Sequence, residues 1–419
     1  MFSIFGILGL GILIGAPVAF VLALSGLVYI FQSGEYASSF ASYLFGSLNS
    51  TALLAIPFFI LAAEILNRSG GTQKLISMVD AWVGHYRGGL PFVAVLATVF
   101  FSTICGSSVA TAAAVGSVII PEMLSRGYNK TFSVGLIATA GGLGILLPPS
   151  IPLIVYGMVT ETSVSGLFKA ATLPGIILAS ILALFAFIMG ARSGIAPAPR
   201  QPMSVRWQRT REAIGTLLLP VIILGGIFSG MFTPTEASAI ACIYALALAV
   251  LVYKVPLKKL PAVLTLSAST ASMILLILAG ATLFGYALTA QRMPHLIFES
   301  ISAMHLEGWQ LLIALMFFFL VLGMFMEVIS VILITMPILI PLLTMSDINL
   351  MHFAVLLILN MELAVITPPI GLNLFVVSAV SKVPVLEVFK GTLPFVAAII
   401  VVLLGMMFIP GAQILTTGW

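Results

Sequence analysis

The sequence predicts an all-α, polytopic membrane protein made of two inverted-topology repeats, with about ten transmembrane helices and two re-entrant helical hairpins. Three observations support this prediction. Hydrophobic residues make up 61% of the 419 residues, and charged residues make up only 7%. A shift of 220 residues superposes landmarks of one half on the other. Most Lys and Arg residues fall on loops that an inverted arrangement places on one side of the membrane.

The composition requires a lipid environment, because a soluble domain carries about 25% charged residues and this chain cannot supply such a surface. Residues 391–419 contain no Asp, Glu, Lys or Arg. Other apolar stretches also reach the roughly 20 residues that a helix needs to cross a bilayer. No alternation typical of a membrane β-barrel is visible, so helices must satisfy the backbone in lipid. The net charge of +4 is scattered over loops and does not indicate a nucleic-acid partner.

The internal repeat is marked by prolines. At a shift of 220 residues Pro148-Pro149 falls on Pro368-Pro369, and Asn129 falls on Asn349. Leu173-Pro174 likewise falls on a Leu-Pro pair. The alternative is chance matching in a Pro-rich chain, but several prolines and an Asn in one register argue against it.

The repeat divides the chain into a first unit over 1–191, a basic, Pro-rich cytoplasmic linker over 192–213 and a second unit over 214–419. Hairpins are expected at about 92–124 and 311–344. The expected crossings are about 2–14, 17–31, 51–66, 131–160 and 168–190, then 214–231, 235–253, 270–287, 351–380 and 391–410. Five crossings in each unit would turn the second unit upside down relative to the first.

The loop charges fit this inversion. With the linker inside, the inside segments hold 15 of the 17 Lys and Arg residues, as the positive-inside rule requires. Loop 254–260 carries three lysines, whereas its counterpart at 32–50 has no basic residue. Counting the hairpins as full crossings would move loops to the wrong side. We therefore expect both termini outside.

Two segments of the first unit interrupt an apolar run. Gly106, Ser107 and Ser108 would form a hairpin tip, although a close-packed helix interface is the alternative. Between Gly144 and Pro148 the expected crossing helix 131–160 should break, because proline lacks an N–H and disfavours helical geometry before it. Ser150 follows the break, at the start of the second half-helix. A kink packed against neighbouring helices would be the simpler explanation.

The second unit has the equivalent segments. Gly323 and Glu327 lie at the other hairpin tip, while Thr367, Gly371 and Asn373 surround the break in the crossing 351–380. Carbonyls freed by such breaks form a hard oxygen site that suits Na⁺. The N-terminus of a half-helix favours a carboxylate. Ser150 and Asn373 are the candidates to face that carboxylate.

Acidic side chains inside a membrane are energetically costly, so each one is a candidate functional residue. For Glu327 and Glu362 the alternatives are ion or substrate linkage and structural hydrogen bonding. Glu236 follows Thr233 as in a helix cap, and Glu64 precedes Arg68 at the spacing of an ion pair. The sequence shows no clustered His, Asp or Glu ligands, which argues against a membrane-embedded enzyme.

At these residues the sequence resembles the large membrane subunit of TRAP (tripartite ATP-independent periplasmic) transporters. The similar stretches are "ICGSS" at 104–108, "GGLGILLPPSIPLIVYG" at 141–157, "GMFTPTEASA" at 230–239 and "NMELAVITPPIGLNLFV" at 360–376. The resemblance implies an elevator-type transporter in a bacterial inner membrane, with a transport domain of hairpins and broken helices moving against a scaffold. It implies Na⁺ as coupling ion and no organic cofactor.

The resemblance also implies site residues. The Na⁺ sites would involve Gly106, Ser107, Gly144 and Pro148 on one side and Gly323, Glu327, Thr367 and Gly371 on the other. Glu327 stands where Asp is expected in relatives. Ser108, Ser150 and Asn373 are the candidate substrate contacts.

The partners implied are a small four-helix membrane subunit and a periplasmic substrate-binding protein that delivers a small carboxylate. The stretch at 360–376 resembles the dicarboxylate-type members, which favours a C4-dicarboxylate or a similar organic or sugar acid. The alternative is a self-sufficient Na⁺- or H⁺-coupled anion symporter of a related elevator fold. A channel or a purely structural subunit would not need a pair of broken helices.

Overall fold

The computed structural model describes residues 2–32, 45–46, 48–256, 258, 260–293, 296, 299, 308–409 and 416. Within these ranges the chain forms helices and no strand, so the expected all-α class is confirmed. Ten helical segments of this described part are long and apolar enough to cross a membrane. Most of the loop expected at 32–50 lies outside the described residues. The inverted arrangement of the two units stays a prediction.

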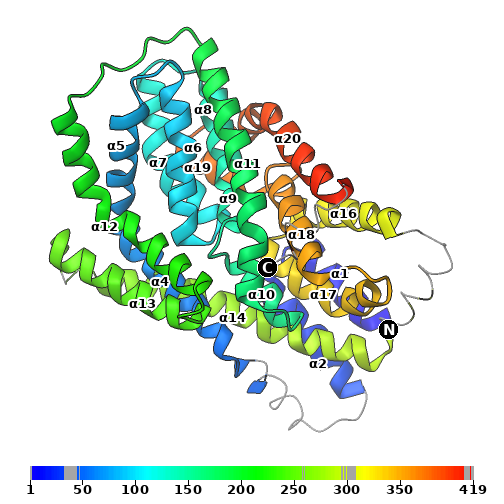
Figure 1. Cartoon of the computed structure of the whole chain (residues 1–419). Coiled ribbons are helices and arrows are strands. Elements are labelled where there is room, and N and C mark those ends of the chain that lie inside the picture. Colours follow the sequence, from blue (N-terminus) through cyan, green and yellow to red (C-terminus); the bar gives the residue numbers. More distant parts are fainter. Residues whose placement is uncertain are drawn as a thin grey trace.

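The helices follow one another along the chain, with a long connection between the end of α11 at Arg192 and the start of α12 at Met203 (Figure 1). The first half contains α1 (Phe2–Leu13), α2 (Val18–Gln32), η1 (Thr51–Leu54), α4 (Ala55–Arg68), α5 (Gly71–Val83), α6 (Gly89–Cys105), α7 (Ser108–Ser125), α8 (Lys130–Gly141), α9 (Leu143–Leu146), α10 (Ile151–Val159) and α11 (Val164–Arg192). The second half contains α12 (Met203–Phe228), α13 (Pro234–Ala247), η2 (Leu248–Val252), α14 (Leu260–Ala290), α16 (Gly308–Phe325), α17 (Val328–Met345), α18 (Leu350–Ala364), α19 (Leu372–Ser381) and α20 (Val385–Phe408).

The interrupted segments lie where the sequence places them. Helices α6 and α7 form the first hairpin, and α16 and α17 form the second. The expected crossing 131–160 is divided into α8, α9 and α10, and the crossing 351–380 is divided into α18 and α19. The peptide bonds Pro148–Pro149 and Pro368–Pro369 are both cis. Whether the hairpins are re-entrant stays a prediction.

Two helical stretches differ from the sequence expectation. Residues 71–83 form α5 inside a segment expected to be a loop, because Leu75, Ile76 and Val79 give this stretch a buried apolar face. At 13 residues α5 is too short to span a bilayer. The linker is also partly helical, since α12 begins at Met203 and includes most of the expected linker's second half.

Helix α14 joins parts of the fold that are distant in sequence. It packs against α2 and α4 on one side and against α17 of the second hairpin on another. Helix α13 in turn packs against α4, and its start is the expected cap, in which Thr233 and Glu236 form a capping box. These helices form a layer that flanks the hairpins and broken helices (Figure 1).

The remaining long helices hold the broken segments from the other side. Helix α20 packs against α8, and α11 packs against α6 and α18. At the α8–α20 crossing the backbones of Gly135 and Gly391 touch, so neither position has room for a Cβ atom. The two halves of the chain are thus interleaved around the breaks, and the candidate site lies on this shared core.

Candidate functional site at the hairpin tips and helix breaks

The first hairpin turns sharply at Gly106. This residue has a left-handed backbone with φ of 64°, and Ser107 is extended before α7 begins at Ser108. The carbonyl oxygen of Gly106 accepts a hydrogen bond of 3.2 Å from the N–H of Ile151, the first residue of α10. The tip of the hairpin is therefore joined to the second half of the first broken helix, a contact that the sequence did not predict.

Gly144 packs directly against this tip. A Cβ atom at Gly144 would come within 2.6 Å of the Ser107 carbonyl oxygen and 2.7 Å of Thr111 Oγ1. Thr111 is fully buried, and its hydroxyl interacts with the Cys105 thiol but has no oxygen or nitrogen partner among the described residues. The sequence did not single out Thr111. A backbone carbonyl and a hydroxyl this close to an interrupted helix are the hard oxygen donors that Na⁺ prefers.

The Pro-Pro pair closes the first break. α9 ends at Leu146, and Leu147 is already extended before Pro148. The Pro149 carbonyl oxygen faces the tip, 2.7 Å from where a Cβ atom of Gly106 would lie. Gly106, Ser107, Gly144 and the Pro-Pro turn thus form one cluster around the break, which fits the predicted first ion site.

The hydroxyl of Ser150 forms its hydrogen bonds within the break and does not face an open space. Its hydroxyl donates to the carbonyl oxygen of Ile145 at 2.5 Å and accepts from the N–H of Leu153 at 3.4 Å. The side chain is fully buried. In this conformation Ser150 caps α10, and its predicted contact with a substrate carboxylate would require the cap to open.

Glu327 is the N-cap of α17 at the second tip. Its carboxylate accepts hydrogen bonds from the N–H groups of Ile329 and Ser330, at 2.9 and 3.4 Å. The equivalent cap of α7 is Ser107, 220 residues earlier. A carboxylate in this position adds a negative charge to the oxygen donors of the tip, which distinguishes the second site from the first.

The second tip is joined to its break in the same way as the first. The carbonyl oxygen of Met324 accepts from the N–H groups of Ile370 and Gly371, both at 3.2 Å. Gly371 is left-handed with φ of 61°, and Thr367 donates to the carbonyl of Leu363 at 2.7 Å. Gly323 lies one turn before the tip and packs against Met361.

Asn373 connects the two breaks. Its Nδ2 donates a 3.1 Å hydrogen bond to the carbonyl oxygen of Ala138 in α8, while its Oδ1 has no partner in the described part of the chain. The backbone N–H of Asn373 bonds to Val365. This predicted substrate residue is therefore fully buried between the two broken helices.

A cavity of about 510 Å³ lies between the two tips and the flanking helices. Four predicted residues line it, namely Gly106, Ser107, Ser108 and Glu327. The other predicted residues lie behind this lining, so the structure brings both tips and both breaks to the edge of one cavity. The far wall is made by α4 and α14.

The far wall contributes polar residues that the sequence did not single out. Asn67 of α4 and Ser267 and Thr270 of α14 line the cavity. Ser267 is buried, and its hydroxyl has no hydrogen-bond partner within the described ranges. Glu64 also lines it while forming the expected pair with Arg68, at 2.5 Å. A run of Ser and Thr over 265–272 was the available signal for Ser267 and Thr270.

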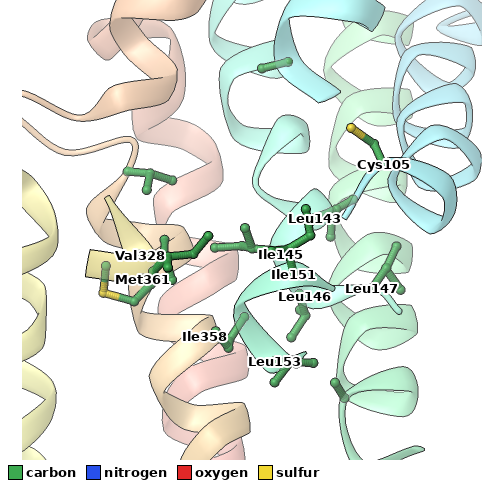
Figure 2. Close-up of a cluster of buried hydrophobic side chains, with 14 of the residues drawn as sticks. Cys105, Leu143, Ile145, Leu146, Leu147, Ile151, Leu153, Val328, Ile358 and Met361 are labelled. Atoms are coloured by element: carbon green, nitrogen blue, oxygen red, sulfur yellow. The ribbon is translucent and has the colours of Figure 1, made fainter. Parts of the chain in front are cut away.

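The space between the breaks is apolar. Figure 2 shows Ile145 and Ile151 of the first broken helix beside Val328, Ile358 and Met361 of the second half, all buried. Water is excluded from such a cluster. Electrostatic attraction at the neighbouring oxygen donors is therefore stronger than at an exposed site.

Comparisons with known proteins agree with this architecture. The family model described as "Tripartite ATP-independent periplasmic transporter, DctM component" matches residues 5–412. The chain belongs to this family. Its members are transport permeases of the inner membrane, so this DctM-family chain is a membrane transporter and not an enzyme.

Individual relatives cover nearly the whole DctM-family chain. The "C4-dicarboxylate TRAP transporter large permease protein DctM" of Pseudomonas aeruginosa is 40% identical over 400 residues, which are 95% of this chain and 94% of that protein. The "Isethionate TRAP transporter permease protein DctMQ" of Oleidesulfovibrio alaskensis is 31% identical over 418 residues, which are 99% of this chain and 66% of that protein. The YdaH transporter of Alcanivorax borkumensis shares the fold, with a TM-score of 0.65 at 13% identity over 90% of this chain and 88% of that one.

Proposed function

We propose that this chain is the permease subunit of a Na⁺-coupled, binding-protein-dependent importer of a small carboxylate, a C4-dicarboxylate or a similar organic acid. The observation that carries the proposal is the shared cavity, which both hairpin tips line and both helix breaks border. Broken helices around a central cavity are typical of secondary transporters, whose substrate and ion sites lie at such breaks.

Support for Na⁺ comes from the donor atoms. The first cluster offers the carbonyl oxygen of Ser107 and the buried hydroxyl of Thr111 beside Gly144. The second offers the Glu327 carboxylate with the freed backbone near Thr367 and Gly371. All of these donors are oxygen atoms, which suits an alkali cation.

Support for a small carboxylate comes from the relatives and from the lining. The Pseudomonas relative is named for C4-dicarboxylates. The Oleidesulfovibrio relative is named for isethionate, a sulfonate, so it supports a small organic anion but not the carboxylate group itself. A cavity of about 510 Å³ has the size of a site for a small ligand. The hydroxyls of Ser108 and Ser267 can donate to carboxylate oxygens there.

The partners of the chain are proposed from its family. A tripartite transporter has a periplasmic binding protein and a small membrane subunit besides the permease. The chain matches only 66% of the length of the Oleidesulfovibrio relative, whose DctMQ name joins two components. We infer that the hairpins and broken helices move as a transport domain against a scaffold that includes α4 and α14.

Reconstitution tests this function. The permease would be placed in proteoliposomes with its small membrane subunit, and uptake of a radiolabelled C4-dicarboxylate loaded on its binding protein would be measured. We expect uptake that requires an inward Na⁺ gradient, the small subunit and the binding protein. Uptake that persists after the Na⁺ gradient is collapsed would refute the coupling. Uptake by the permease alone would favour the self-sufficient symporter instead.

A further inference from the structure

Glu362 is a buried acid that the proposed Na⁺ sites do not use. It lies in the middle of the core with 0% exposure, six residues before Pro368 in the second broken helix. Neither of its carboxylate oxygens has a hydrogen-bond partner among the residues that the structure describes. Most buried polar side chains are paired, so a fully orphaned carboxyl group calls for an explanation.

The carboxyl group lies against the first broken helix. A Cβ atom at Gly142 would come within 2.5 Å of Glu362 Cγ and 2.9 Å of Glu362 Oε1. Gly142 is the residue between α8 and α9, at the start of the first break. Because Gly142 has no side chain, the Glu362 side chain can pack against its backbone. The two broken helices therefore meet at Glu362.

No cation within the described ranges neutralises this group. Helices α9, α10, α11, α16, α17 and α20 pack against α18, and α9, α16 and α17 carry no titratable residue within their bounds. On α10, Tyr156 bonds to the carbonyl of Leu350. His352 of α18 lies ten residues from Glu362, about 15 Å at the rise of an α-helix.

The charged residues of α11 and α20 are also remote. Lys169 follows Gly166, which packs against Met351 at the distant end of α18. Arg192 lies at the C-terminus of α11, two residues past Gly190, which packs against Pro91 of α6.

On α20, Glu387 and Lys390 precede Gly391, and Gly391 packs against Thr131 at the start of α8. Thr131 is eleven residues from Gly142 along α8, about 16 Å. The Glu327 carboxylate is engaged by the N–H groups of its own cap.

An ionised carboxylate without a partner in such a place carries a large desolvation penalty, whereas the protonated acid is neutral. We propose that Glu362 is a proton-binding site of the transport cycle, which holds a proton in this occluded arrangement and exchanges it once per cycle. On the inner side the Glu362 O–H bond breaks and the proton passes to water. On the outer side the carboxylate takes a proton from water. The proposal rests on the proposed transport function and adds a coupled proton to it.

Proteoliposomes containing the whole complex and an internal pH dye test the proposal. The Na⁺ gradient and the voltage would be held fixed, and the substrate would be supplied as its dianion at mildly alkaline pH. We expect wild-type uptake to acidify the lumen. Glu362→Gln mimics the neutral acid and cannot exchange a proton, so whatever Na⁺-dependent uptake it retains should lose the acidification and the pH dependence. Glu161→Gln, at an exposed loop acid, is the matched control and should behave as wild type.

Two results would overturn the proposal. One is wild-type uptake that moves no proton although it still requires Na⁺, which leaves the proposed function intact. The other is acidification by Glu362→Gln equal to that of wild type. If Glu362→Gln fails to insert, infrared spectroscopy of the wild type and of Glu362→Asp gives an independent readout. A protonated carboxylic acid band must be present at neutral pH and be lost under inward-facing, substrate-free conditions, and its absence at neutral pH would also refute the proposal.

Discussion

Asn373 of the second broken helix donates its side-chain amide to the carbonyl oxygen of Ala138 in the first, across 3.1 Å. The two residues are 235 positions apart in sequence. In a regular helix the N–H of Gly142 would donate to the carbonyl of Ala138, four residues earlier. At the end of α8 it donates to the carbonyl of Thr139 instead. The Ala138 carbonyl therefore accepts its hydrogen bond from Asn373, in the other half of the chain. This bond ties one break to the other.

Replacing Asn373 by Leu should therefore destabilise the protein. The change leaves a buried carbonyl without its donor, which costs about 1–3 kcal/mol. The melting temperature of the purified protein in detergent should fall, and uptake should fall with it. Gln208→Leu, at an exposed position near the start of α12, is the control. Equal melting of Asn373→Leu and the control would show that the bond contributes nothing.

Gly144→Ala should disrupt the first proposed ion site. The added Cβ would collide with the Ser107 carbonyl and the Thr111 hydroxyl, at 2.6 and 2.7 Å. The tip must then move away from the break, and we expect the Na⁺ concentration for half-maximal uptake to rise by about tenfold or more. Gly225→Ala in α12 meets no atom within 4 Å and serves as the control. Unchanged Na⁺ activation would contradict the assignment.

Substitutions at Glu327 can separate its charge from its role as a helix cap. Glu327→Gln keeps an oxygen acceptor for the N–H of Ile329 but removes the charge, so Na⁺ activation should weaken while melting stays nearly constant. Glu327→Ala removes both, which should add a loss of about 1 kcal/mol in stability. Glu327→Asp should retain both properties. Normal Na⁺ activation in Glu327→Gln would restrict this residue to capping.

Thr367→Ala tests the second break. The hydroxyl is held by the carbonyl of Leu363 at 2.7 Å, which fixes its oxygen beside the break. Loss of one neutral oxygen ligand is worth about 1 kcal/mol, or roughly a fivefold weaker Na⁺ dependence. Membrane insertion should be unaffected, as judged by yield and gel filtration. An unchanged Na⁺ activation curve would remove Thr367 from the site.

The contact between His85 and Arg206 should depend on pH. The guanidinium lies 3.4 Å from Nδ1 of His85, and desolvation by burial, followed by the charges of Arg206 and Arg200, lowers the pKa of His85. The folded state therefore favours neutral His85. Its contribution to stability is complete above the ordinary pKa of 6.5 and is lost as the pH falls through the lowered folded-state pKa.

Melting curves at several pH values check this expectation. The wild type should lose stability on mild acidification, and His85→Gln, which cannot be protonated, should show a shallower dependence on pH. Parallel curves for the two proteins would mean that the contact does not titrate.

The sequence predicted the positions of the hairpin tips and breaks because Gly and Pro act locally. Gly106 and Pro148 interrupt helices through their own backbone restrictions, whatever packs against them. The charge-free apolar runs likewise predicted the helices. Helix α5 was missed because its apolar face is short and mixed with Lys74 and Asp80, which suggested a loop.

The sequence could not predict which hydroxyls would not bond to a carbonyl of their own helix. Ser and Thr on a helix usually bond to a carbonyl one turn earlier, as Thr265 and Thr270 of α14 do. Ser267 and Thr111 do not, and nothing in their neighbouring residues distinguishes them. The difference arises from contacts with segments far along the chain, such as the one between Thr111 and Gly144.

The lining of the cavity has a consequence for the order of events. Among its described residues are two acids, Glu64 and Glu327, and no Lys or Arg. Glu64 is paired with Arg68, so the Glu327 carboxylate is the charge that repels a dianion and attracts a cation. For the Na⁺-coupled importer that we propose, ion loading then precedes substrate loading, and an unloaded permease is closed to its own cargo. Such a carrier would resist running backwards as a leak, because intracellular substrate would enter the cavity only after the ions are bound again.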